Sequence, residues 1–306
     1  MEEIREKIKF LVRKKKSLIE ICKELDLSQQ EVIGIVTLMK EDGELVDYVK
    51  GEIIRIKKLV VSGEETFVRD DAKVIKMILI SDTHMGSKAE RQDVIKYLYG
   101  YADENDIKYV LHSGDLTDGY YPNRPQQVYE LKKHGYDEQL DHVVSKYPRF
   151  NGKTYFVTGN HDFTHIRNGG GDIGRAIARE REDMVYLGAD QGDLTINKLK
   201  IHMYHGAGGR AYAKGYKLQR YAETLTPGKY DILTRGHSHD ALYMYYLDMH
   251  CFQCGALVNE TQFSRMLGLK NEISAWIVKA YLDQKGKPYA IEQRQEVFTK
   301  KRVKSK

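Results

Sequence analysis

The 306 residues carry 49 lysines and arginines against 44 aspartates and glutamates, and 41% of the chain is hydrophobic. This balance is typical of a globular protein, and the length allows one large domain and a small one. No apolar run approaches the roughly 20 residues of a membrane-spanning helix, and the charged residues 1–16 do not resemble a signal peptide. We therefore expect a cytoplasmic protein without a membrane partner.

The formal net charge of +5 is unevenly distributed. Basic runs occur at 13–16 and 300–306, and such runs attract phosphate backbones. A solvated helix face and a frayed tail explain them equally well, so they permit a nucleic-acid partner without requiring one.

The three cysteines fit a reducing compartment. Cys251 and Cys254 have C-x-x-C spacing, but no second pair accompanies them. If residues 241–258 form a hairpin, side chains three positions apart point to opposite faces. We expect a buried, inert pair and not a zinc site.

The first 62 residues show helical spacing of apolar side chains and then strand-like alternation. Ser28 is a candidate N-cap of the third helix, and Lys50-Gly51 a candidate turn. The expected elements are helices at 4–12, 18–25 and 29–40 and a hairpin over 44–61.

Three helices followed by a hairpin resemble the winged helix-turn-helix superfamily, whose members can place a helix in the DNA major groove. The candidate recognition helix, 29–36, is poor in Arg and Lys. Gln29 and Gln30 could contact bases, but Glu31 would repel phosphates. A DNA reader and a partner-binding or dimerising module therefore both stay open.

The polar residues 63–72 are predicted to be a linker to a second domain at 73–306. In that domain short apolar strands alternate with amphipathic helices, which indicates an α/β fold with a layered sheet. Strands are expected at 74–80, 107–112, 154–157, 184–187, 194–204, 230–234, 242–250 and 273–282, and helices at 91–102 and 126–147.

Five of these strands end in polar residues. In open α/β sheets functional groups gather at the carboxyl ends of strands. Each block alone is weak, because Asp and Asn commonly cap turns and a lone His is usually an ordinary polar residue. Chance does not explain the presence of all five blocks in this order. The blocks are Asp82-Thr83-His84, Gly114-Asp115, Gly159-Asn160-His161-Asp162, His205-Gly206 and Gly236-His237-Ser238-His239.

With these blocks, residues 75–258 resemble the calcineurin-like metallophosphoesterases. The resemblance implies a four-layer α/β/β/α sandwich with a two-metal site between its sheets. By position, His161 would be the catalytic histidine that binds no metal, and Asp162 would orient His161 or cap a turn. One metal would be held by Asp82, His84 and His239, the other by Asn160, His205 and His237, with Asp115 bridging them.

Carboxylate, amide and imidazole ligands suit Mn²⁺, Fe or Zn²⁺ better than Mg²⁺, and manganese is our first expectation. Two ions about 3.5–4 Å apart polarise phosphoryl oxygens and activate a bridging water. The resemblance implies in-line attack by a bridging hydroxide, without a phospho-enzyme. His161 would stabilise the developing charge or protonate the leaving oxygen.

The motif does not separate phosphomonoesterases, protein phosphatases, cyclic-nucleotide phosphodiesterases, nucleases and lipid-precursor hydrolases. Aromatic residues interleaved with cations follow two blocks, as stacking of bases above a phosphate backbone requires. The candidates for substrate binding are Tyr120, Tyr121, Arg124, Arg210, Tyr212 and Lys214. His165, next to a Gly-rich loop, lines the cleft or lies on the surface. Ordinary polar roles are expected for His112, His134, His142, His202 and His250.

We therefore predict a two-metal phosphodiesterase or nuclease acting on DNA or RNA, whose N-terminal module recruits substrate or a partner. A phosphomonoesterase or protein phosphatase is the first alternative. A DNA-binding regulator with an inert phosphoesterase domain is the second. The complete ligand set argues against the second, since an abandoned site would have lost a ligand.

Overall fold

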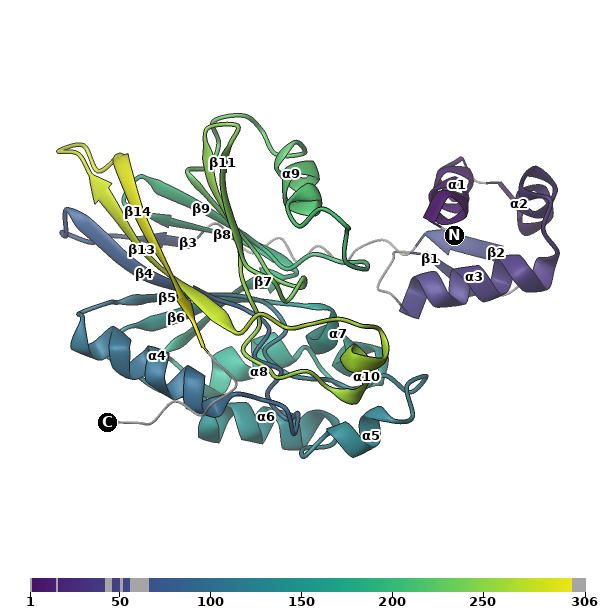
Figure 1. The fold of residues 1–306 in the computed structure, drawn as a ribbon, viewed down its shortest axis with the longest axis horizontal. Coiled ribbons are helices and arrows are strands. Elements are labelled where there is room, and N and C mark those ends of the chain that lie inside the picture. The colour runs from purple at the N-terminus through teal and green to yellow at the C-terminus, as the bar shows by residue number, and fades with distance from the viewer. Residues whose placement is uncertain (1, 15, 42–45, 50–51, 56–65, 299–306) are drawn as a thin grey trace. The chain divides into compact units, whose positions relative to one another are not determined.

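The computed structural model describes residues 2–14, 16–41, 46–49, 52–55 and 66–298 (Figure 1). The chain forms two compact units, one built mainly from Met1–Val60 and one from most of Val61–Lys306. None of the helices in the described ranges is long and apolar enough to cross a membrane. The basic run at 300–306 lies outside the described residues.

The small unit contains three helices and a two-stranded antiparallel sheet. Ser17 and Ser28 cap the second and third helices, each in a reciprocal pair with the Glu three residues later. Apolar side chains from all three helices and both strands share one core. This element order is the expected one, although the candidate turn at Lys50-Gly51 lies outside the described residues. The elements are α1 (Glu2–Arg13), α2 (Leu18–Leu25), α3 (Gln29–Glu41), β1 (Val46–Val49) and β2 (Glu52–Arg55).

The large unit contains two mixed six-stranded sheets. The first has the order β14-β13-β4-β5-β6-β7, and its members are β4 (Val74–Ile80), β5 (Tyr109–Ser113), β6 (Lys153–Thr158), β7 (Met184–Ala189), β13 (Ser274–Leu282) and β14 (Pro288–Val297). The second has the order β11-β12-β10-β9-β8-β3, and its members are β3 (Thr66–Val68), β8 (Gln191–Ile196), β9 (Leu199–Tyr204), β10 (Ile232–Arg235), β11 (Leu242–Tyr246) and β12 (Met249–Gln253).

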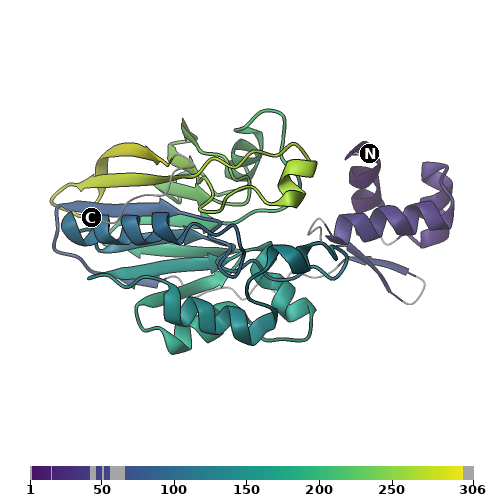
Figure 2. The same ribbon diagram turned by 60° about the horizontal axis from the view of Figure 1, so that its bottom comes forward.

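Alternating side chains of the first sheet enter two different cores. Met77 and Leu79 of β4 join a cluster shared by both sheets, whereas Ile78 and Ile80 join one shared with helices. The helices covering the first sheet are α4 (Gln92–Glu104), α6 (Gly135–Lys146) and α8 (Ile173–Glu180), and α9 (Tyr216–Ala222) packs on the second (Figures 1 and 2). Strands buried on both faces account for the continuous apolar runs in the sequence.

One helix expected from the sequence is divided. Residues 126–147 form α5 (Gln127–Glu130) and α6 and not a single helix. Leu131 is extended and bridges Ser87, and Gly135 has a φ of +74°. Backbone pairing with a segment distant in the sequence and a glycine in the left-handed conformation therefore override the helical periodicity.

Two expected strands are also divided, each into a hairpin. Residues 194–204 belong to β8 and β9, and residues 242–250 to β11 and β12. Asn197 at the first turn and Leu247 and Asp248 at the second have positive φ. Two consecutive positive φ values form the tight turn that matches strand twist, but Leu-Asp is an unusual sequence for it.

The expected linker 63–72 contains structure. Thr66–Val68 forms β3, which pairs in parallel with β8 at the edge of the second sheet. Thr, Phe and Val are residue types that favour strands, and they interrupt the otherwise polar segment 63–72. Cys251 and Cys254 are buried, free and in separate apolar clusters, as expected for an inert pair on opposite faces.

Candidate metal centre

The seven candidate ligands come together from five strand ends. Strands β4, β5 and β6 are parallel neighbours in one sheet, and β9 and β10 in the other, so the loops that follow them share an edge. Ligand atoms of Asp82, His84 and His239 lie within 4.8 Å of one another, as do those of Asp115, His205 and His237. The Asn160 Oδ1 is 3.1 Å from His205 Nε2 and 2.7 Å from His237 Nδ1.

Asp115 faces both groups. Its Oδ2 is 3.1 Å from His205 Nε2 and 3.9 Å from His84 Nε2. A carboxylate in this position can be shared by two cations, which is the bridging arrangement expected from the sequence.

Three imidazoles are oriented through their Nδ1 atoms. When Nδ1–H donates to a fixed oxygen, the neutral ring presents the lone pair of Nε2 on the opposite side. The three contacts are His84 Nδ1 to Asp118 Oδ1 at 2.9 Å, His239 Nδ1 to Asn271 Oδ1 at 3.0 Å and His205 Nδ1 to the Ser113 carbonyl at 2.7 Å.

These Nε2 atoms point at other acceptors. His84 Nε2 and His239 Nε2 are 3.3 Å apart, and Asp82 Oδ1 is 3.0 Å from His239 Nε2. Asp82 Oδ1 is buried and has no hydrogen-bond partner among the described residues. Lone pairs that converge on one point, with a carboxylate among them, fit a bound cation.

The backbone at this centre adopts a rare conformation. Five candidate ligands, none of them glycine, have φ between +44° and +71°. Such angles cost on the order of 1–3 kcal/mol each and are concentrated at functional sites. The five are Asp82, His84, Asp115, His237 and His239.

Two glycines allow the loops to approach so closely. A Cβ on Gly159 would overlap Asp115 Oδ1 and lie 2.6 Å from His205 Nε2. One on Gly236 would overlap Ser81 Oγ. The glycine before each ligand block therefore leaves space that a side chain would fill.

Opposite charges determine the ionisation of the buried groups. Burial opposes ionisation of Asp82 and Asp115, but neighbouring histidines hold the pKa of both carboxyls well below the usual range. Burial also opposes protonation of His205, yet Asp115 and Asp82 raise its pKa to about 9. The donor set thus carries a strong negative potential that attracts protons or metal ions.

His161 lies beside the ligands. Its Nδ1 donates to the Asp118 carbonyl at 2.6 Å, and its ring packs edge-on against His84 with centroids 4.4 Å apart. Ligating atoms of His84, Asp118 and His161 form a third close group, but hydrogen bonds already use those atoms. Burial lowers the pKa of His161 to about 4, so its imidazole is neutral near pH 7.

The family comparison agrees with this geometry. The model of the calcineurin-like phosphoesterase superfamily domain matches residues 75–266, which contain all seven candidate ligands. The chain belongs to this superfamily. No curated protein matches the chain.

Several solved structures are similar to this chain. A novel archaeal phosphodiesterase is 17% identical over 73% of this chain and 99% of its own, with a TM-score of 0.43. Vps29 from Entamoeba histolytica, as a single mutant, is 15% identical over 73% and 99%, with a TM-score of 0.37. The 5'-nucleotidase precursor from Thermus thermophilus is 12% identical over 73% of this chain and 54% of its own, with a TM-score of 0.40.

Of the two roles expected for Asp162, orienting His161 or capping a turn, the structure shows the second. Its carboxylate accepts hydrogen bonds from the backbone of Leu116, Thr117 and Gly159 and from the Thr117 hydroxyl. Asp162 therefore ties the loop after β5 to the start of α7 (Asn160–Arg167), and Asp118 orients His161 instead.

Sequence reasoning missed two residues that orient ligands, Asp118 and Asn271. Asp118 follows Asp115 by three positions, so the spacing within one loop could have signalled it. Asn271 reaches His239 from 32 residues away and has no local signal.

Tyr121 has a structural role in the candidate metal centre. Its side chain is 5% exposed, and its hydroxyl accepts a hydrogen bond from Asn160 Nδ2 at 2.8 Å. That bond turns Asn160 Oδ1 toward His205 and His237. Tyr121 is therefore buried beside the ligands, unavailable for stacking on a base, whereas Tyr120 is half-buried next to it.

The other candidate substrate contacts divide into buried and exposed positions. His165 is buried within α7 and contacts Thr117 Oγ1, so it does not lie in a surface loop, the second of its two expected places. Arg210 Nε donates to the Ser238 carbonyl at 2.6 Å. Tyr212 is fully exposed, and Lys214 Nζ is 3.3 Å from Glu272.

The five histidines outside the motif have ordinary partners or lie at the surface. His112, His142 and His202 are buried and contact Thr83, Glu90 and Asp193. His250 contacts the Tyr243 hydroxyl, and His134 is exposed. None of the five joins the ligand groups of the described residues.

Proposed function

We propose that the large unit is a two-metal-dependent phosphodiesterase that cuts DNA or RNA. One observation carries the proposal. Two groups of buried and half-buried ligand atoms meet at Asp115, and three of the imidazoles are held so that their Nε2 lone pairs converge. A site of this kind can bind a pair of divalent cations.

The proposed division of ligands follows the two groups. Asp82, His84 and His239 would hold one ion, Asn160, His205 and His237 the other, and Asp115 both. Bound ions supply positive charge that polarises phosphoryl oxygens and lowers the pKa of water. Oxygen and imidazole ligands without a thiolate favour manganese, with iron and zinc as the alternatives.

His161 is the proposed proton donor to the leaving oxygen. With Nδ1–H bonded to the Asp118 carbonyl, Nε2 is the ring atom that can carry a second proton. The ring is neutral without substrate, and the charge of a bound phosphate, added to that of the Asp118 carboxylate 3.8 Å from His161 Nδ1, would raise the His161 pKa so that Nε2 takes up the proton that it donates.

Aromatic and cationic side chains near the centre support a nucleic-acid substrate. The Arg124 guanidinium lies 4.4 Å from the ring centroid of Tyr121 and 4.2 Å from that of Phe263. This sandwich fixes a planar cation whose N–H edges suit a phosphate. The exposed Tyr212 is placed to stack on a base, with Arg210 and Lys214 close to it in the chain.

The small unit is proposed to be a winged helix-turn-helix-like module that recruits a partner. The exposed side of α3 presents Gln30, Gly34, Thr37 and Leu38, and no described side chain among its exposed positions is basic. Such a surface suits a protein, including a second copy of this chain, better than DNA. We further propose a cytoplasmic location.

The test is an assay of the purified chain with Mn²⁺ on phosphodiester and phosphomonoester reporters and on single- and double-stranded DNA and RNA. We expect turnover of the diester and of nucleic acid, abolished by a chelator. Turnover of the monoester alone would exclude the nuclease proposal.

Substitution of ligands tests the site itself. Asp115→Asn and His237→Ala are expected to reduce activity by more than the roughly 100-fold typical of residues that only orient a ligand. Asp141→Asn and His134→Ala, at exposed positions outside the site, are the matched controls. Undiminished activity of the ligand variants would exclude the metal centre.

A further inference from the structure

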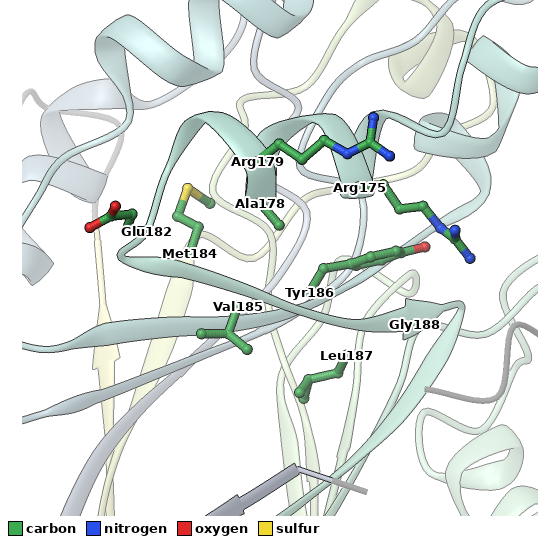
Figure 3. A pocket seen from close by; sticks show the side chains of 9 residues that line it. All are labelled: Arg175, Ala178, Arg179, Glu182, Met184, Val185, Tyr186, Leu187 and Gly188. Atoms are coloured by element: carbon green, nitrogen blue, oxygen red, sulfur yellow. The ribbon is translucent and has the colours of Figure 1, made fainter. Parts of the chain in front are cut away.

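An open surface groove with a volume of about 540 Å³, called the α8–β7 cavity below, lies between helix α8 and edge strand β7 (Figure 3). Met184, Leu187 and Gly188 of β7 form apolar parts of its wall, and Tyr186 presents an aromatic ring. From α8, Arg175 and Arg179 border the same space. The cavity therefore combines an aromatic ring, an apolar surface and two cations.

The charges are distributed along the cavity. Arg175 and Arg179 are four residues apart on α8, so they lie on one face of the helix. Both are exposed, and Arg175 also pairs with Asp172 at 3.2 Å. Figure 3 shows Arg175 and the Tyr186 hydroxyl at one end and Glu182 toward the other. An anionic group is therefore favoured at the Arg175 end.

That end is connected to the metal centre. The Tyr186 hydroxyl is 3.3 Å from Thr158 Oγ1, two residues before the candidate ligand Asn160. The backbone N–H of Asp190, just after β7, donates to the Thr158 carbonyl, and that of His205 donates to the Asp190 carbonyl. The carboxyl end of β7 thus belongs to the same edge of the fold as the ligands.

Further arginines continue the positive charge toward the centre. Arg124 and Arg167 both oppose the rise in the pKa of Tyr121 that burial causes, so both lie near Tyr121. At Tyr186 burial and then the Asp172 and Asp162 carboxylates raise the pKa, and Arg175 opposes the carboxylates by a smaller amount. Cations therefore lie beside the aromatic residues at both places, with carboxylates close to Tyr186 as well.

The edge of β7 is poorly suited to an added peptide strand. The register of β7 against β6 shifts between the pairs Phe156–Tyr186 and Val157–Gly188, which leaves Leu187 as a bulge. Bulges interrupt ladders and protect sheet edges from further pairing. A ligand that uses rings and phosphates therefore fits this place better than an extended peptide.

We propose that the α8–β7 cavity binds a nucleotide that flanks the cut in a single nucleic-acid strand, with its base against Tyr186 and its phosphates on Arg175 and Arg179. The inference rests on the proposed nucleic-acid phosphodiesterase function. It adds a second binding site, and hence a preference for strands that extend beyond the cut.

Binding is measured by fluorescence anisotropy of a single-stranded oligonucleotide with EDTA present, so that hydrolysis plays no part. For the full chain with Arg175→Gln and Arg179→Gln we expect a Kd about tenfold higher at moderate salt. Loss of two phosphate contacts should also reduce the salt slope by about 1.4, at about 0.7 per contact. Lys279→Gln with Arg294→Gln, on β13 and β14 at the opposite edge of the same sheet, is the matched control and should bind like the parent chain.

Location is tested by photo-crosslinking of an oligonucleotide that carries 5-iodouracil. We expect adducts on the peptide that contains residues 184–188. An unchanged Kd in the α8 variant, an equal loss in the control, adducts only elsewhere, or no oligonucleotide binding by the parent chain would each overturn the inference. Hydrolysis of a small diester with Mn²⁺ is measured separately on the parent chain. Its absence would count against the proposed function, whereas intact hydrolysis with an unchanged Kd counts against the cavity alone.

Discussion

At the scale of single residues, hydrogen bonds outside the ligand set determine how the imidazoles of the centre are presented. Asp118, Asn271 and the Ser113 carbonyl each accept from an Nδ1 atom. An imidazole without such an acceptor can rotate or change tautomer, and a metal then loses a preorganised lone pair. These acceptors are as much a part of the site as the ligands.

Asp118→Asn tests this orientation. An amide is uncharged and stabilises the His84 ring less than a carboxylate does, so we expect Mn²⁺ affinity and activity to fall by about 10- to 100-fold. Isothermal titration with Mn²⁺ and diester turnover measure the two effects. Asp141→Asn, exposed on α6, serves as the control, and equal values for Asp118→Asn and the parent chain would contradict the prediction.

Buried His112 should make stability depend on pH. Burial lowers its pKa to about 3 from 6.5, and the Gly114 N–H donates to its Nδ1, which requires a neutral ring. Above pH 6.5 the His112 ring is neutral in the folded and in the unfolded chain, so its full contribution to the free energy of unfolding is present. It is lost as the pH falls from 6.5 toward 3, since only the unfolded chain takes up the proton there.

We therefore expect His112→Gln to reduce the acid sensitivity of the free energy of unfolding by about 1.4 kcal/mol per pH unit between pH 6 and pH 4. Urea unfolding in EDTA at several pH values measures this slope. His134→Gln, at an exposed position, should keep the slope of the parent chain. A His112→Gln slope identical to that of the parent chain would show that His112 is not neutral in the fold.

At the scale of elements, the site depends on short turns between strands and the segments that follow them. The turn after β6 passes directly into α7, and Asp162 closes it by accepting from the Gly159 N–H at 2.9 Å. Because of this turn, Asn160 and His161 are the first two residues of α7. The length and glycine content of the turn are therefore constrained by the ligands it carries.

Gly159→Ala should remove metal binding without unfolding the protein. Its Cβ would overlap Asp115 Oδ1, so the bridging carboxylate or the turn has to move. Gly100→Ala is the matched control, because no atom lies within 4 Å of its Cβ in α4. Alanine in a helix interior should stabilise the control by about 1 kcal/mol. Mn²⁺ titration and thermal unfolding distinguish the two variants, and normal Mn²⁺ affinity in Gly159→Ala would contradict the prediction.

At the scale of the whole molecule, the candidate ligands all belong to the large unit, and the small unit has a core of its own. The residues that orient the ligands also lie in the large unit, between Asp82 and Asn271. Catalysis and recruitment are therefore expected to be separable functions.

Deletion of residues 1–62 tests that separation. We expect the remaining chain, which retains β3, to hydrolyse a small diester with the kcat/KM of the full chain. If the module recruits a protein, nucleic-acid affinity should also be unchanged by the deletion. A large loss of affinity would show instead that the module binds DNA.

Much of this arrangement could be predicted from local patterns. Continuous apolar runs located the buried strands, because side chains on both faces of such a strand enter a core, as those of β4 do. The five polar blocks pointed to one site, since parallel strands bring their carboxyl ends to a common edge. These signals are local, and backbone geometry imposes them within a few residues.

Other features were decided only by tertiary contacts. Leu131 ends a helix because its backbone pairs with that of Ser87, and β3 forms because its backbone hydrogen-bonds to that of β8. Asp162 binds backbone N–H groups about 45 residues away and not the adjacent His161. Hydrogen-bond partners come from segments distant in sequence, and burial selects among them. The amino-acid sequence by itself therefore determined which residues gather at the centre, whereas the tertiary structure decided which oxygens orient them.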